Sequence, residues 1–242
     1  MPAPERSPTG PDFTRAWDLA DPVAGWLTED QGRLLFEEAV AAGAGARLLE
    51  IGSHQGRSTV LLGRVALAAG GEVVAIDPFV EGRLFGGLST REKFRANLER
   101  AGVATVVRPV EEYSTRARPQ WTEVVDLVYI DGKHDVWTLA DDLRWRSFLP
   151  PGGSVLVHDA FSSIGVTLGI LLRILPAGDL AYVRRVGSMA LFQRRRPTVA
   201  DRLRIVRELP WWLRNVGLKV LLRLRLRPVA RLLGHDSPYD PY

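Results

Sequence analysis

A glycine turn between two apolar runs constrains the fold of this chain more than any other feature. The first run, residues 47–51, is short and apolar, as expected for a buried strand. Gly52 and Gly56 follow it and allow a tight turn into residues 58–69, which have the length of a helix. A second apolar run comes at residues 72–76. This order predicts two parallel strands joined by a helical crossover.

The same alternation of strands and helices continues along the chain. We predict strands at residues 47–51, 72–76, 104–107, 124–130, 154–157, 182–186 and 189–193. We predict helices at residues 29–42, 58–69, 90–101, 111–116, 136–148 and 164–174. The last two strands flank Gly187-Ser188 and read as a hairpin. The chain is therefore expected to have an α/β fold, with a doubly wound, mainly parallel sheet covered on both faces.

Composition and charge divide the chain into three parts. Residues 1–27 are predicted to be a polar segment, 28–195 the α/β domain, and 196–242 a helical basic appendage. Between Arg194 and Arg231 there are 12 Lys/Arg and 2 acids, which leaves 32 − 12 = 20 basic and 28 − 2 = 26 acidic residues elsewhere. The basic character of the chain therefore belongs to its tail.

Some classes of protein are excluded or disfavoured by composition. There are no cysteines, so disulfides, thiolate metal sites and cysteine nucleophiles are excluded. Residues 1–12 lack the apolar core of a signal peptide, and no apolar run approaches the roughly 18 residues of a membrane span. We therefore expect a cytoplasmic protein.

Four residues around the first turn predict a nucleoside site. In a doubly wound sheet, ligands bind beyond the carboxyl ends of the strands. Gly52 and Gly56 let the backbone approach a ligand, and the carboxylate of Asp77 at the next strand end can accept hydrogen bonds from both ribose hydroxyls. Glu50 could orient the turn or meet an ammonium group through water. A turn that binds no ligand is the alternative.

A nicotinamide dinucleotide is the chemical rival for this turn, and would indicate an oxidoreductase. Its fingerprint is Gly-x-Gly-x-x-Gly, whereas this chain has His54 and Arg57 at the second and third glycine positions. The glycines that cradle a pyrophosphate are absent, which favours a ligand without a diphosphate.

Several motifs together resemble class I S-adenosylmethionine-dependent methyltransferases. They are Leu48-Leu-Glu-Ile-Gly-Ser-His-Gln-Gly-Arg-Ser-Thr59, Asp126-Leu-Val-Tyr-Ile-Asp-Gly-Lys-His134, Asp142-Leu-Arg-Trp145, Leu149-Pro-Pro-Gly-Gly153 and His158-Asp159. The similarity covers about residues 46–162. It implies a Rossmann-like sheet of seven strands with the last strand antiparallel.

The resemblance also implies where S-adenosylmethionine is held. The methionine part would contact Glu50, Gly52, Ser53, Gly56 and Ser58, the ribose Asp77, and the adenine would lie near Val110 and Glu111.

Two acids and two histidines predict a divalent-cation site. Asp131 and Asp159 each end one of two adjacent parallel strands, so their carboxylates should lie side by side, with His134 and His158 close by. We predict Asp131, Asp159 and His158 as ligands of Mg²⁺ or Mn²⁺. A bound cation lowers the pKa of a hydroxyl, and His134 could take its proton, which makes His134 and Asp131 the catalytic candidates. The alternative is that Asp131 only caps the following turn, Asp159 only hydrogen-bonds loop amides, and His134 is a surface loop histidine.

This second group of residues resembles metal-dependent O-methyltransferases of the catechol type, and more closely those that act on macrolide sugars. The resemblance implies methyl transfer to a hydroxyl of a small molecule, such as a sugar or secondary metabolite. Val136 replaces an aromatic residue common in that family.

The basic appendage 196–242 offers two interpretations. Trp211-Trp212 and the arginines interleaved with leucines after them suit a peripheral contact with the inner membrane face or a partner protein. The same segment could instead pack back on the domain. No recognition motif supports nucleic acid. The alternative function is thus a non-catalytic, methyltransferase-like scaffold docked through its tail.

Overall fold

The computed structural model describes residues 11–80 and 88–232. Their seven strands are ordered β3-β2-β1-β4-β5-β7-β6. The strands are β1 Arg47–Ile51, β2 Glu72–Ile76, β3 Val107–Val110, β4 Leu127–Ile130, β5 Ser154–Val157, β6 Leu180–Val186 and β7 Met189–Arg194. β1, β2 and β3 pair in parallel, and β7 is antiparallel to both β5 and β6. The predicted seven-stranded, mainly parallel sheet is confirmed.

The chain divides into two compact units, which are described separately. Unit 1 contains residues up to Ala117 together with Val125–Leu127, and unit 2 contains Arg118–Val124 and the chain from Val128 onward. No helix among the described residues is long and apolar enough to span a membrane.

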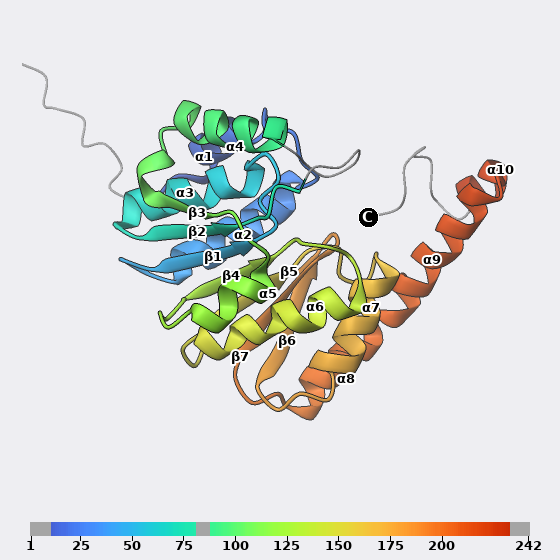
Figure 1. Ribbon diagram of the computed structural model, residues 1–242. Coiled ribbons are helices and arrows are strands. Elements are labelled where there is room, and N and C mark those ends of the chain that lie inside the picture. The colour runs from blue at the N-terminus through green and yellow to red at the C-terminus, as the bar shows by residue number, and fades with distance from the viewer. Residues whose placement is uncertain (1–10, 81–87, 233–242) are drawn as a thin grey trace, which may run out of the picture. The chain divides into compact units, whose positions relative to one another are not determined.

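Unit 1 contains the parallel strands β1, β2 and β3, with helices packed on them (Figure 1). Its helices are α1 Phe13–Ala20, α2 Glu29–Ala41, α3 Arg57–Ala69, α4 Leu88–Arg100 and the short α5 Ser114–Ala117. Helix α3 contacts α1, α2 and both β1 and β2. Its buried residues include Val60, Leu61 and Leu62, so this helix forms the centre of the unit's core.

Helix α1 lies inside the segment 1–27, for which only a polar segment was predicted; residues 1–10 of it are outside the described residues. Asp12 begins the helix because its carboxylate accepts hydrogen bonds from the backbone amides of Thr14 and Arg15. Ala16 and Ala20 are buried on its inner face. A capping aspartate four residues before a buried alanine is the sequence signal that was missed.

Strand β3 begins three residues later than the sequence analysis predicted. Residues Ala104–Val106 form a 3₁₀ turn instead of a strand, closed by a hydrogen bond from the amide of Val106 to the carbonyl of Val103. The prediction was wrong because the apolar run owes its burial to Val103 and Val107 on either side of the turn, whereas none of residues 104–106 is buried. The helix predicted at 111–116 is likewise reduced to α5.

Unit 2 contains most of β4, all of β5, β6 and β7, and a second set of helices. These are α6 Val136–Asp142, the 3₁₀ segment Leu143–Phe148, α7 Ile164–Gly169, the π-helical turn Ile170–Ile174, α8 Val199–Arg207, α9 Leu209–Arg223 and α10 Arg227–Leu232. The short 3₁₀ segment Arg118–Gln120 also belongs here. Strands β4 and β5 are buried along their whole length, as their apolar sequences predict.

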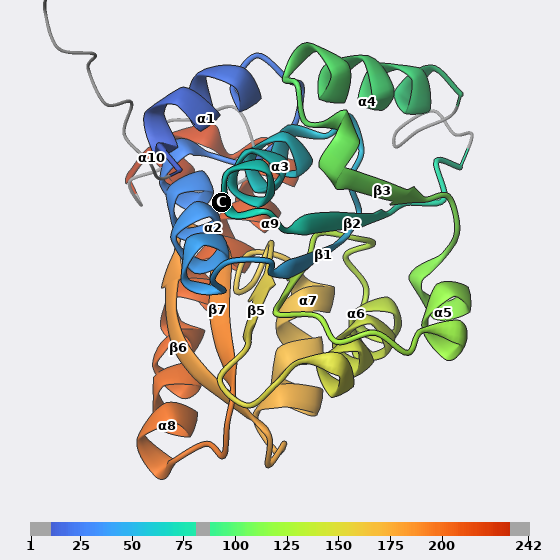
Figure 2. The same ribbon diagram turned by 90° about the vertical axis from the view of Figure 1, so that its left-hand side faces the viewer.

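The basic segment after residue 195 belongs to the same compact unit as β5, β6 and β7. Helix α8 lies beside β6 in both views (Figures 1 and 2). Ile205 of α8 and Leu218 of α9 are buried. The described part of the predicted appendage is therefore helical and packed at its start; residues 233–242 lie outside the described residues.

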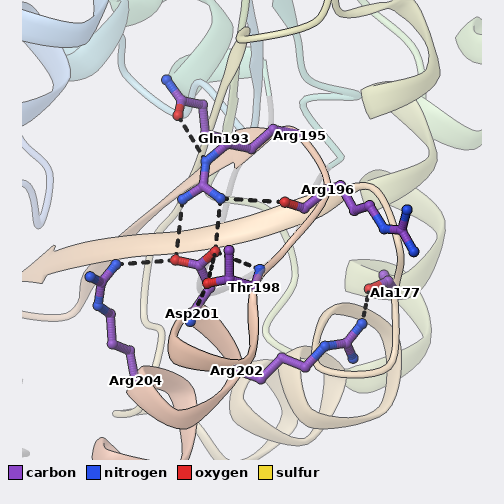
Figure 3. A network of polar contacts seen from close by, with 8 residues as sticks. All are labelled: Ala177, Gln193, Arg195, Arg196, Thr198, Asp201, Arg202 and Arg204. Atoms are coloured by element: carbon purple, nitrogen blue, oxygen red, sulfur yellow. Dashed lines mark hydrogen bonds and ion pairs between the residues drawn. The ribbon is translucent and has the colours of Figure 1, made fainter.

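Asp201 fastens the start of α8 to the end of β7 (Figure 3). Its carboxylate is almost fully buried and accepts hydrogen bonds from both terminal nitrogens of Arg195, at 2.8 and 3.2 Å, and from Arg204 at 3.1 Å. It also accepts the amide of Thr198, whose hydroxyl accepts the amide of Asp201 in return, forming a capping box. Hydrogen bonding to Arg195, opposed by burial, holds the pKa of Asp201 well below its usual range.

We predict that Asp201→Ala lowers the free energy of unfolding by about 1–2 kcal/mol at pH 7, because the cap and the paired carboxylate are lost together. Urea unfolding measures the change. Asp179→Ala is the matched control, since its carboxylate pairs with Arg146 but is nearly half exposed, and it should cost less than about 1 kcal/mol.

The same comparison at lower pH tests the ionic part of the interaction. A depressed pKa stabilises the fold above the unfolded pKa of about 3.9, and this stabilisation is lost as pH falls toward the folded pKa. The difference between wild type and Asp201→Ala should therefore be smaller at pH 3 than at pH 7. An equal difference at both pH values would contradict a role for the charge.

Candidate functional site

The turn after β1 depends on two glycines in the left-handed region. Gly52 has φ = 89° and Gly56 has φ = 90°, and His54 between them also has a positive φ of 47°. A Cβ on Gly56 would lie 3.1 Å from Cδ2 of Phe94. Both backbone conformation and packing therefore require glycine at position 56. The predicted glycine turn into helix α3 is present as the sequence indicates.

The carboxylate of Glu50 forms hydrogen bonds within the protein. Its side chain is fully buried at the end of β1, and its carboxylate accepts hydrogen bonds from the hydroxyls of Ser58 and Thr59 in the first turn of α3. These bonds fix the direction in which the helix leaves the turn. Of the two roles considered for Glu50, the geometry displays the orienting one.

Asp77 connects the end of β2 to the same turn. One carboxylate oxygen accepts the amides of Ser53 at 3.0 Å and His54 at 2.9 Å, and the other accepts the amide of Phe79 at 2.8 Å. A carboxylate has about four acceptor positions, so it can take a further hydroxyl while it holds the turn.

The turn presents buried polar atoms that have no hydrogen-bond partner among the described residues. Ser53 is 3% exposed, and its hydroxyl oxygen makes no hydrogen bond within the described chain. The same holds for Nδ1 of His54, whose ring lies against Trp26 with centroids 5.3 Å apart. A buried polar atom left without a partner costs about 1–3 kcal/mol. These atoms therefore fit a site where a polar ligand supplies the missing hydrogen bonds.

The two residues predicted near an adenine lie after β3. The carbonyl of Val110 accepts the amide of Asp77 at 3.1 Å. The carboxylate of Glu111 binds Arg91 at 2.9 Å and Arg95 at 2.6 Å, both from α4. The hydrogen bond from Arg91, opposed by partial burial and reinforced by Arg95, lowers the pKa of Glu111. Arg91 and Arg95 are four residues apart and so lie on one face of a helix, which is the sequence signal that points to an acidic partner such as Glu111.

A second cluster of functional side chains lies wholly in unit 2. Among residues 11–80 and 88–232, one set of acids and histidines offers ligand atoms all within 4.8 Å of one another: Asp131, His134 and Asp159. Nε2 of His134 lies 3.0 Å from Oδ2 of Asp159 and 3.8 Å from Oδ1 of Asp131. The structure thus brings together the two predicted acids with the predicted base.

His158 is buried next to this cluster. It is 4% exposed, and its Nδ1 lies 3.4 Å from Oδ1 of Asp131 and 3.6 Å from Oδ2 of Asp159. Its predicted place as a ligand is taken in the close cluster by His134, which is half exposed. The role of His158 as a ligand stays a prediction.

Neighbouring groups hold both acids in place. The hydroxyl of Tyr129 donates to Asp131 at 3.0 Å, and the hydroxyl of Ser162 donates to Asp159 at 3.2 Å. Asp159 has φ = 54° and Phe161 has φ = 58°, conformations that are strained for residues other than glycine. Such strain persists only where surrounding contacts impose it. Hydrogen bonds from Ser162 and Ser163 hold Asp159 in this conformation.

The charges of this cluster are mutually dependent. Burial alone would disfavour a charged His158, yet Asp131 and Asp159 together raise its pKa to about 9. Burial likewise opposes ionisation of Asp159, but the two histidines lower its pKa to about 2. A hydrogen bond with Asp131 and the charge of Asp159 outweigh burial and raise the pKa of His134. Ionised acids with adjacent histidines form a donor set suited to a divalent cation.

Helix α9 supports the loop that carries Asp159. Nζ of Lys219 donates to the carbonyl of Ser162 at 3.0 Å, and Nδ2 of Asn215 donates to the carbonyl of Phe161 at 3.5 Å. Asn215 is 1% exposed. Sequence reasoning missed both residues, because nothing in the tail indicated which segment it would contact.

Comparison with known proteins gives a family match over the central region of the chain. Residues 49–160 match the family described as a methyltransferase domain. A similar solved structure, cofactor-bound Rv0187 from MTB, is 26% identical and covers 76% of this chain and 88% of its own, with a TM-score of 0.56.

Two further solved structures share the fold. The O-methyltransferase from Bacillus cereus in complex with SAH is 20% identical, covering 76% of this chain and 89% of its own with a TM-score of 0.57. The O-methyltransferase TomG from Streptomyces achromogenes, involved in tomaymycin synthesis and in complex with SAM, is 21% identical, with coverages of 76% and 89% and a TM-score of 0.55.

We predict that Glu50→Ala lowers the free energy of unfolding by about 2–4 kcal/mol, because two buried hydroxyls lose their acceptor and a cavity forms. Urea unfolding measures the loss. Glu72→Ala is the matched control, since Glu72 begins the next strand and binds Arg47 but is about one-third exposed. It should cost less than about 1 kcal/mol. Equal losses would contradict the orienting role of Glu50.

Proposed function

Because residues 49–160 match the family described as a methyltransferase domain, we propose that the protein transfers the methyl group of S-adenosylmethionine to a hydroxyl of a small molecule with the help of a divalent cation. One observation carries this proposal beyond the family: the cluster of Asp131, His134 and Asp159, whose ligand atoms lie within 4.8 Å of one another.

The cofactor is assigned to the turn after β1. The unpartnered hydroxyl of Ser53 and the remaining acceptor positions of Asp77 suit the polar groups of a nucleoside with an amino-acid tail. The neighbours with bound SAH and SAM support the same ligand, since they share this fold. Sulfonium is an activated leaving group, so the protein's main task is alignment of the reacting atoms.

The acceptor hydroxyl is assigned to the acidic cluster. Asp131 and Asp159 would hold the cation, which when bound lowers the pKa of a coordinated hydroxyl. His134 is half exposed beside both acids and takes the hydroxyl proton on a ring nitrogen. The oxygen then bonds to the methyl carbon as the carbon–sulfur bond breaks, leaving S-adenosylhomocysteine.

A sugar or secondary metabolite is the proposed class of acceptor. The motifs at Asp131, His134 and Asp159 are similar to those of enzymes that methylate macrolide sugars. TomG, which has the same fold, takes part in tomaymycin synthesis. Vicinal hydroxyls on such a molecule could share one cation, which fits a site with two carboxylates.

We predict that the purified protein binds S-adenosylhomocysteine, and that Asp77→Asn weakens binding by at least about tenfold, because a charged acceptor for the ribose hydroxyls becomes a neutral one. Titration calorimetry measures both. Asp126→Asn is the matched control: it too is an aspartate whose carboxylate accepts a backbone amide, that of Arg47. It should bind as wild type does. Absence of any binding to the wild type would contradict the proposed function.

We predict that the protein binds Mn²⁺ and that Asp159→Asn weakens this binding by at least about tenfold, since one charged ligand is lost. Asp135→Asn is the control, because Asp135 lies in the same region, caps α6 and pairs with Lys133, and asparagine is an equally good cap. Calorimetry with Mn²⁺ measures both variants.

The two results separate the parts of the proposal. If S-adenosylhomocysteine binds and Mn²⁺ does not, the cation-assisted step is wrong and the methyltransferase assignment stands.

With a panel of hydroxylated acceptors, EDTA should abolish methyl transfer and Mn²⁺ should restore it. His134→Ala should retain Mn²⁺ but lose turnover if the histidine is the base, and lose Mn²⁺ if it is a ligand.

A further inference from the structure

Helix α9 has a buried face and, on the opposite side, an exposed apolar face. Its inner face is buried against the rest of unit 2 through Asn215 and Leu218, which are 1% and 0% exposed. Its outer face carries Leu213, Val220 and Leu224, which are 60%, 51% and 63% exposed. The spacings of seven and four residues place these three side chains along one stripe of the helix.

This arrangement explains why the sequence of α9 has a poor amphipathic pattern. Packing on the unit requires only one apolar face, and Leu218 is on it. The outer stripe of Leu213, Val220 and Leu224 is therefore surplus to what folding needs. Isolated exposed leucines are ordinary, but an aligned stripe on the solvent face of a packed helix marks an interaction surface.

Basic residues surround the outer stripe. Arg214 and Arg223 lie on its two sides at helical spacing, and both are exposed. From Arg223 to Leu232 the chain carries four arginines, alternating with Leu224, Leu226, Val229 and Leu232, and no acid occurs between Glu208 and Asp236. The four apolar side chains are each more than 40% exposed. Apolar and cationic groups thus share one surface.

The end of α9 and α10 extend beyond the strands and the other helices of unit 2 (Figure 1). At Arg225 the chain turns with φ = 60°, so α10 starts in a new direction. We define the docking segment as residues 213–232. Its inner side is attached by Asn215, Leu218 and Lys219, and its outer side faces away from the fold that it is attached to.

We propose that the docking segment binds an anionic lipid surface. A bilayer presents phosphate groups directly above hydrocarbon, so leucines can enter the interface while the arginines stay at headgroup level with their stems alongside. Charge argues against a second copy of the chain as occupant, since two such surfaces would repel each other.

Vesicle co-sedimentation of the full chain tests this proposal. The probes are vesicles of phosphatidylcholine alone and of phosphatidylcholine with about one-third phosphatidylglycerol. We expect binding to the anionic vesicles only, weakened by salt. Val220→Ser/Leu224→Ser and Arg223→Glu/Arg227→Glu should each reduce partitioning by at least about tenfold.

Matched controls separate this surface from general stickiness. Leu67→Ser on α3 is 41% exposed, and Arg100→Glu ends α4 at an exposed position. Both should sediment as wild type does. Melting temperatures should be unchanged in all variants, because only exposed side chains are altered; if the serine pair melts early, Leu213→Ser replaces it.

Four outcomes would overturn the proposal. One is absence of binding to the anionic vesicles, and another is equal loss in the controls. The third is a dimer seen by light scattering that Val220→Ser/Leu224→Ser converts to monomer without any vesicle binding, which would assign the stripe to self-association. Binding to polyglutamate as strong as binding to vesicles would assign the surface to an acidic protein instead.

Discussion

The turn after β1 is organised around one carboxylate that never meets solvent. Glu50 is placed at the strand end, and the hydroxyls of Ser58 and Thr59 in the next helix satisfy its carboxyl group, since a buried polar group left without hydrogen bonds costs more than each bond contributes. This demand sets where α3 starts, and α3 is the helix against which α1, α2, β1 and β2 pack. The glycines make the turn sterically allowed, and Glu50 selects one direction from those allowed.

The sequence predicted the fold well wherever burial and periodicity coincide. β1, β2 and β5 were predicted at their observed bounds, because a short apolar run between glycine turns has few other uses. β3 was misplaced by three residues, since Val103 and Val107 are buried on either side of a 3₁₀ turn that has no period of its own. Helix α1 was missed because one capping aspartate is a weak local signal and its burial comes only from tertiary contacts.

The candidate site divides in the same way. Residues fixed by local chain geometry, such as Gly52, Gly56 and Asp131, could be located from their place after a strand. What each side chain touches could not. Glu111 binds arginines 16 and 20 residues away, and His134 reaches Asp159 across 25 positions, distances over which sequence alone gives no register. The support from α9 was beyond prediction for the same reason.

The hydrogen bonds from α9 to the carbonyls of Phe161 and Ser162 couple the tail to the loop that carries Asp159. Phe161, like Asp159, has a positive φ, so α9 contacts the strained part of this loop. If a cation binds the cluster of Asp131, His134 and Asp159 as proposed, loosening of α9 would weaken its binding, and cation binding would in turn stabilise the attachment of α9 by the same free energy. Helix α9 would then act as an effector element for the proposed cation site.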